Sequence, residues 1–219
     1  MKTLYALLLA LVSAGGAQAA DSFHPSDDPA AIQRGAVLFM DNCASCHSLK
    51  YLHYDQLHQD LGFSTAQVKT DQTLTQSSAS SPITAQLTAE MTQKMFGMTP
   101  PDLSLITSAQ SPDWVYRYML GFYPDSSRPS GVNNHVVQDV AMPNVLAPLQ
   151  QQVGDQAFAA KVGDLVSFLH YAADPKAAER RHIGIWVLLF LIIFLIPVYL
   201  LDKDARKHTA AQGRITPKR

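Results

Sequence analysis

The chain has 219 residues, 47% of them hydrophobic, which is enough for one domain with additional segments. Its formal charge of −1 hides two opposite regions. Residues 21–174 hold 15 acidic and 7 basic side chains, a net of −8, whereas residues 175–219 hold 9 basic and 3 acidic ones, a net of +6. An acidic region of this size favours basic protein partners, and we expect no nucleic-acid partner.

The first 19 residues have the pattern of a secretory signal peptide. Lys2 precedes an apolar run over residues 4–12, and Ala17-Gln18-Ala19 forms a small-residue cleavage site. The apolar run is too short to cross a bilayer. We therefore predict that residues 1–19 are removed and that residues 20–182 form an exported domain.

Residues 28–42 are predicted to form the first helix of this domain. Asp28 is a suitable N-cap, and Pro29 suits the first helical position. Apolar residues then recur on one face, at Ile32, Ala36 and Phe39.

The rest of the domain is expected to be helical or irregular, with no strand-rich stretch. Residues 64–93 are rich in Ser, Thr and Gln and predict an exposed excursion with one helix near 84–95. Residues 112–122 predict a second helix and residues 154–172 the last one. Residues 123–148 contain four prolines and predict a long ordered loop. We therefore expect a mainly α fold.

A membrane anchor is indicated by residues 183–201, which carry no charge. At about 1.5 Å per residue, their length matches the roughly 30 Å hydrocarbon core of a bilayer. Pro197 is expected to kink the last turn, and the basic residues that follow favour a cytoplasmic tail over residues 202–219. With the export signal, this predicts a single-pass protein of a bacterial inner membrane whose domain lies in the periplasm.

The two cysteines of the chain lie in Cys43-Ala44-Ser45-Cys46-His47. In this C-x-x-C-H pattern, two thiols can bond to the vinyl groups of a haem, and the next residue can ligate its iron. We therefore predict one covalently bound haem c, held by Cys43, Cys46 and His47. A redox disulfide would leave His47 unexplained, a structural disulfide between residues this close would be strained, and a zinc site would need more ligands.

A second pattern surrounds this motif. Gly35, Phe39 and Cys43 are each four residues apart, and Leu165-Val166-Ser167-Phe168-Leu169 carries a matching pattern in the last helix. The pair resembles the terminal helices of class I cytochromes c, where a glycine lets the two helices cross closely. We therefore expect a class I cytochrome c-like haem domain with a long loop excursion and one C-terminal transmembrane helix.

A low-spin haem needs a second axial ligand, and Met142 is the favoured candidate. Pro143 excludes a helical backbone at Met142, and the pair precedes the last helix, where class I cytochromes place this ligand. Met98, His135 and an open iron site are the alternatives. Three other methionines lie in expected helices, where Met mostly fills the core: Met91, Met95 and Met119.

Four features in order resemble the cytochrome c1 family, the membrane-anchored haem subunits of ubiquinol–cytochrome c reductase. They are CASCHSLKYLHY at 43–54, PPDLSLI at 100–106, SRPSGVNN and then AMPNVL within 127–146, and the C-terminal anchor. Their order makes the match more specific than C-x-x-C-H alone. The resemblance covers residues from about 30 to about 205.

The resemblance implies an electron-transfer subunit that is not catalytic alone. A Rieske iron–sulfur protein would supply single electrons, a cytochrome c would accept them, and cytochrome b would complete a homodimeric complex. It also implies that Pro101 lies beside the haem, where its carbonyl or that of Pro100 orients His47.

Some positions depart from the family. Ser108 and Gln110 stand where members usually carry arginines, one of them near a haem propionate, and His53 and Ser130 replace a frequent Arg and Trp. The propionate contacts are therefore open. Two other functions compete with the cytochrome c1 interpretation: an anchored haem subunit of a terminal oxidase, and a haem enzyme or gas sensor with an open iron site. A purely structural anchor protein is a third alternative.

Overall fold

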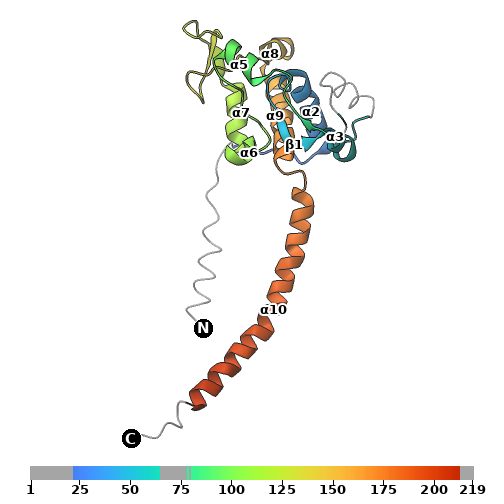
Figure 1. The fold of residues 1–219 in the computed structure, drawn as a ribbon, viewed down its shortest axis with the longest axis vertical. Helices are drawn as coiled ribbons and strands as arrows, with labels where there is room; N and C mark the ends of the chain where they lie inside the picture. The colour runs from blue at the N-terminus through green and yellow to red at the C-terminus, as the bar shows by residue number, and fades with distance from the viewer. Residues whose placement is uncertain (1–21, 65–77, 79, 213–219) are drawn as a thin grey trace. The chain divides into compact units, whose positions relative to one another are not determined.

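The computed structural model describes residues 22–64, 78 and 80–212. The predicted signal peptide and residues 65–77 and 79 of the Ser-rich excursion lie outside this range. The described elements, in chain order, are α2 (Pro29–Asn42), β1 (Leu49–His53), α3 (Tyr54–Leu61), β2 (Pro82–Ile83), α5 (Ala89–Phe96), α6 (Ile106–Ala109), α7 (Pro112–Leu120), β3 (Phe122–Pro124), β4 (Val132–Asn134), α8 (Ala147–Val153), α9 (Asp155–Ala173) and α10 (Ala177–Gln212) (Figure 1). The prediction of a mainly α fold is confirmed.

The chain divides into two compact units, one ending at Ala173 and the other beginning at Asp174. In the first unit, α9 lies between α2 and α7 and contacts both (Figure 1). Helix α2 begins as predicted, because the Asp28 side chain accepts a hydrogen bond from the Ala30 amide and Pro29 follows it. Its apolar face is buried at Ile32, Ala36 and Phe39.

The crossing of α2 and α9 depends on Gly35. A Cβ atom added at Gly35 would lie 2.0 Å from the carbonyl oxygen of Asp164 and 2.8 Å from the Cβ of Phe168. The rings of Phe39 and Phe168, both fully buried, pack beside this point with centroids 5.6 Å apart. Arg34 adds a two-pronged ion pair to the Asp164 carboxylate. The predicted close crossing is therefore confirmed.

Two short antiparallel strand pairs complete the first unit. Strand β1 pairs with β2, and β3 pairs with β4 in the register Phe122↔Asn134. The second pair corrects two predictions. Helix α7 ends at Leu120, because Gly121 caps it and Phe122 starts β3, and the expected loop over 123–148 contains a hairpin and the start of α8.

Helix α10 makes up most of the described part of the second unit. Within it, Ala177–His208 is long and apolar enough to cross a membrane, because it contains an 18-residue stretch with a mean hydropathy of 2.8, none of which is buried. The helix continues through Pro197 and beyond the predicted end at Leu201. Pairs at i,i+4 spacing support this extension, such as Arg206 with Asp202.

Candidate haem site

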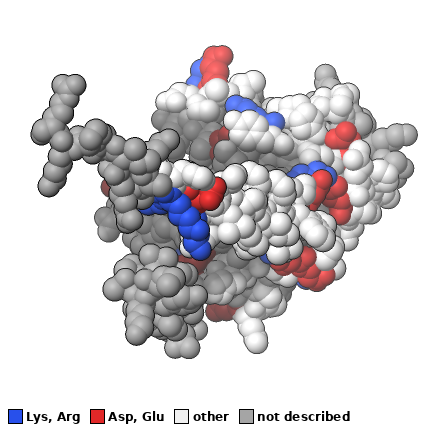
Figure 2. Space-filling view, turned by 90° about the horizontal axis from the view of Figure 1, so that it is seen from below, with Lys and Arg blue, Asp and Glu red and all other residues white. Residues whose placement is uncertain are grey.

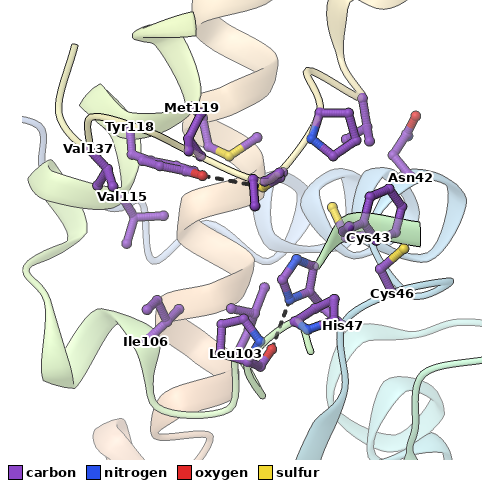
Figure 3. A pocket seen from close by; sticks show the side chains of 18 of the residues that line it. Asn42, Cys43, Cys46, His47, Leu103, Ile106, Val115, Tyr118, Met119 and Val137 are labelled. Carbon is purple, nitrogen blue, oxygen red and sulfur yellow. Dashed lines mark hydrogen bonds between the residues drawn. The ribbon is translucent and has the colours of Figure 1, made fainter. Parts of the chain in front are cut away.

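An apolar cavity of about 390 Å³ lies in the first unit. Its walls come from the end of α2, the C-x-x-C-H turn, the segment 96–106, helix α7, the segment 137–145 and helix α9. Figure 3 shows Cys43, Cys46 and His47 on one side of it, with Val115, Tyr118 and Val137 on the other. The volume falls in the range of roughly 300–1,000 Å³ that is usual for cofactor sites.

The cysteines lie on a turn that continues α2. The Cys43 amide donates to the Phe39 carbonyl, and the Cys46 and His47 amides donate to the Cys43 carbonyl. This turn brings both sulfur atoms and the imidazole to one wall. The two thiols are not joined to each other, and burial raises the pKa of the Cys43 thiol to about 12.

His47 has a fixed orientation. Its Nδ1 donates a hydrogen bond of 2.8 Å to the Pro101 carbonyl oxygen. Since the proton is on Nδ1, the other ring nitrogen, Nε2, has a lone pair that can ligate iron. Burial lowers the pKa of His47 and so favours this neutral form, while the bond to Pro101 acts in the opposite direction.

The segment that carries Pro101 is tied to the residues after the C-x-x-C-H motif. The carboxylate of Asp102 accepts hydrogen bonds from the amides of Lys50 and Ser104, each 3.0 Å long. The Ser104 hydroxyl accepts from the Tyr51 amide at 3.2 Å. These bonds explain how the Pro-Pro-Asp-Leu-Ser run holds its carbonyl beside His47.

Met142 lines the cavity from the irregular segment between β4 and α8. The hydroxyl of Tyr118 donates to its sulfur at 3.5 Å. Met98 and Met119 line the same cavity. His135 is exposed, is not among the lining residues, and stacks on Tyr123 with ring centroids 4.4 Å apart.

The five residues selected from the sequence, Cys43, Cys46, His47, Pro101 and Met142, all line this one cavity. Their donor set and the apolar walls fit a haem c: two thiols for the vinyl groups, an imidazole, a thioether and a dry surface for the ring. Ser108 and Gln110 are exposed and do not line it. Within residues 22–64, 78 and 80–212, no group of three or more His, Cys, Asp or Glu side chains is placed to hold a metal ion.

Sequence reasoning did not identify two aromatic residues of the site. Trp114 and Tyr118 both line the cavity from α7, and their rings stack with centroids 5.4 Å apart. Their spacing of four residues within an expected helix was the available signal, because it places both rings on one face.

Comparison with known proteins decides the family. Residues 19–209 match the model of the cytochrome C1 family. This chain belongs to the cytochrome c1 family.

A cytochrome c1 of Allochromatium vinosum is 36% identical, over 89% of this chain and 91% of that protein. An ammonia monooxygenase gamma subunit of Nitrosomonas europaea is 34% identical, over 81% of this chain and 82% of that protein. A mitochondrial cytochrome c1 of Arabidopsis thaliana is 29% identical, over 82% of this chain and 67% of that protein. These matches confirm the resemblance to the cytochrome c1 family that the four sequence features indicated.

Proposed function

We propose that this chain is the membrane-anchored c-type cytochrome of a quinol–cytochrome c reductase in a respiratory chain. In this role it takes single electrons from a Rieske iron–sulfur protein and passes them to a cytochrome c. The observation that carries the proposal is the convergence of Cys43, Cys46, His47 and Met142 on one apolar cavity in a cytochrome c1-family chain.

Each of these residues has a part in holding one haem c. Cys43 and Cys46 would form the two thioether bonds, His47 would ligate the iron through Nε2, and Met142 would supply the second protein ligand to the iron. A haem c bound there supplies a centre that alternates between ferric and ferrous iron. Cys43 is buried and His47 is fixed by Pro101, so the first three bonds start from a rigid turn.

The distal ligand suits the direction of electron flow. A Rieske centre can have a potential as high as roughly +300 mV, so its acceptor needs a high potential too. A thioether stabilises ferrous iron better than a second imidazole, and apolar walls disfavour the extra charge of ferric iron. The apolar lining of the cavity and the placement of Met142 therefore support a high-potential carrier.

The location follows from the two ends of the chain. Residues 1–19 act as the export signal, residues 20–182 form the periplasmic domain, residues 183–201 cross the inner membrane, and residues 202–219 remain in the cytoplasm. The apolar helix Ala177–His208 supports a single crossing. Cytochrome b and the Rieske protein are the expected neighbours, in a homodimeric complex.

The deciding experiment purifies the native complex from membranes through a tag on this chain. Haem staining of a denaturing gel should label a band of this chain's mass, since thioether-bound haem survives denaturation. Cytochrome b and a Rieske protein should co-purify, and quinol should reduce the c-type haem. Co-purification of terminal oxidase or ammonia monooxygenase subunits instead would refute the assigned complex, and an unstained band would refute covalent haem.

A further inference from the structure

Two buried asparagines of the β3–β4 hairpin have no role in the haem-binding scheme above. Asn133 and Asn134 end the SRPSGVNN segment, and their exposed fractions are 7% and 0%. A buried amide is destabilising unless its polar atoms have hydrogen-bond partners. Both amides have partners, but the partners lie in different parts of the structure.

Asn133 bonds within its own hairpin. Its Nδ2 donates to the Asp125 carboxylate at 3.0 Å, and its Oδ1 accepts from the backbone N–H of Asn134 at 2.9 Å. These bonds stabilise the turn between β3 and β4. They reach neither α7 nor the segment that carries Met142.

Asn134 instead joins two separate segments. Its Nδ2 donates to the Tyr118 carbonyl in the last turn of α7 at 2.7 Å. Its Oδ1 accepts from the amides of Val136 at 2.8 Å and Val137 at 3.4 Å. A Cβ at Gly121 would lie 3.1 Å from this Oδ1, so the residue that follows α7 packs directly against the side-chain amide of Asn134.

The two joined segments form the wall of the cavity opposite His47. Tyr118 is held at its carbonyl by Asn134 and donates from its hydroxyl to the Met142 sulfur. Its ring is confined by Trp114, stacked at 5.4 Å, and by Phe122, edge-on at 5.4 Å. Val137 belongs to the same wall (Figure 3).

A second attachment lies closer to Met142. The Arg128 guanidinium donates to the carboxylate of Asp139 at 2.8 Å and to its carbonyl at 2.7 Å. Asp139 has a φ of 58°, which is uncommon for a residue other than glycine and needs support from its surroundings. The chain is therefore fixed at two points before it reaches Met142.

We propose that Asn134 is a positioning residue for the distal ligand: it fixes Tyr118 and the 136–137 backbone so that the Met142 thioether faces the iron. This inference rests on the proposed function, because it requires a haem ligated by Met142. It also gives the SRPSGVNN segment a role in iron ligation.

The test compares Asn134→Leu with Asn133→Leu in the full-length, haem-loaded chain in detergent. Each replacement keeps the branched shape of the side chain with a bulkier apolar end and removes the hydrogen bonds of one buried amide, so both should lower Tm. Asn134→Leu alone should lose the weak long-wavelength absorption of sulfur-ligated ferric haem. It should also raise the fraction of ferrous haem that binds carbon monoxide by about tenfold or more. A tenfold change is the effect expected when about one hydrogen bond that favours the iron-bound position of Met142 is lost.

Three outcomes would overturn the inference. Asn134→Leu could keep the absorption and exclude carbon monoxide, in which case Asn134 serves stability alone. The Asn133→Leu protein could lose Met142 ligation to the same extent, which would mean that general destabilisation of the hairpin is the cause. Asn134→Ser, a milder variant used if Asn134→Leu takes up no haem, could behave as the unaltered chain.

Met142→Leu in the same series separates this inference from the proposed function. If Met142→Leu leaves the absorption and the carbon monoxide response unchanged, Met142 is not the ligand and the proposed ligation is wrong. If Met142→Leu abolishes the absorption while the Asn134 variants keep it, only the positioning role is refuted.

Discussion

The Nδ1 atom of His47 donates a hydrogen bond to the carbonyl oxygen of Pro101. The two residues come from separate sequence features, the C-x-x-C-H motif and the Pro-Pro-Asp-Leu-Ser run. A partner on Nδ1 makes the imidazole a stronger donor to a metal through Nε2 and fixes the plane of its ring. The resemblance to cytochromes c1 left open which proline carbonyl would do this, and the contact is made by Pro101.

Asp102→Asn should weaken the support of this contact. The replacement removes one acceptor oxygen from a carboxylate that binds the Lys50 and Ser104 amides. We expect a loss of about 1–3 kcal/mol in the free energy of unfolding, measured by denaturant titration. A looser Pro101 carbonyl should also make His47 a weaker ligand and raise the haem potential. Asp41→Asn, at an exposed position of α2, is the control, and equal losses in both variants would contradict the prediction.

Met142→Leu should remove the distal ligand while keeping the volume. The free energy of unfolding should change by less than about 1.5 kcal/mol apart from the lost iron bond. The haem potential should fall, and quinol-to-cytochrome c turnover should fall with it, while haem staining of the band is unchanged. Met98→Leu and Met119→Leu are matched controls, because both side chains line the same cavity. If Met98→Leu changes the spectrum and Met142→Leu does not, Met98 is the ligand.

Gly35→Ala should destabilise the haem domain. The new methyl group would lie 2.0 Å from the Asp164 carbonyl oxygen, so α2 and α9 must move apart. Overpacking of this kind typically lowers the free energy of unfolding by about 1–3 kcal/mol. Here the clash is with the backbone of Asp164, which cannot move aside as a flexible side chain can. Gly184→Ala is the control, since nothing lies within 4 Å of a Cβ there. Equal thermal stability of the Gly35 variant and the unaltered chain would show that the crossing is less tight than described.

The reduction of a basic cytochrome c should slow as salt rises. The domain carries a net charge of −8 over residues 21–174. Among the described residues of this domain, Arg34, Lys94, Arg117 and Arg128 each form an ion pair with one of its carboxylates, which leaves the excess negative charge on other acidic side chains. In the single view of Figure 2, the visible Asp and Glu side chains of the whole chain lie apart from one another. We expect steering by the total charge of the domain, which salt screens once the Debye length falls to about 8 Å. A bimolecular rate that does not depend on salt would indicate a tethered or apolar-docked acceptor.

A chain that ends at residue 182 should give a soluble, haem-loaded domain. The first compact unit ends at Ala173, and the apolar stretch of α10 follows it. The truncated protein should appear in the periplasmic fraction with its haem attached. If it stays with membranes that lack the rest of the complex, residues 183–201 are not the anchor.

Local signals account for the parts of the fold that were predicted correctly. Asp28 before Pro29 marked the start of α2, and Gly35 with Phe39 indicated its partner helix. The β3–β4 hairpin was not predicted, because strands of three residues are too short to show an alternating pattern. The predicted end of helix α7 was two residues too far along the chain, since the apolar pattern continues into Phe122 while Gly121 ends the helix.

The cavity could be predicted from the sequence only in part. The C-x-x-C-H spacing determines which side chains share a turn, so Cys43, Cys46 and His47 could be grouped without a structure. The bond between Tyr118 and Met142 and the two-segment contact of Asn134 depend on how α7 packs against a distant loop. No local pattern encodes such contacts. The presence of Met98 in the same cavity as Met142 also depends on long-range packing and could not be predicted from the sequence.

The tight contact between Gly35 and Asp164 has a consequence for biogenesis. Ribosomes and export channels deliver a chain from its N-terminus, so α2 and the haem-attachment cysteines emerge well before α9. The crossing joins distant parts of the sequence, and such contacts form late because a long loop must close first. If Cys43 carries haem as proposed, its sulfur, which is buried in the finished domain, is open to haem attachment during that interval. Under the proposed function, the order of synthesis would give the thiols access to the haem before folding closes the site.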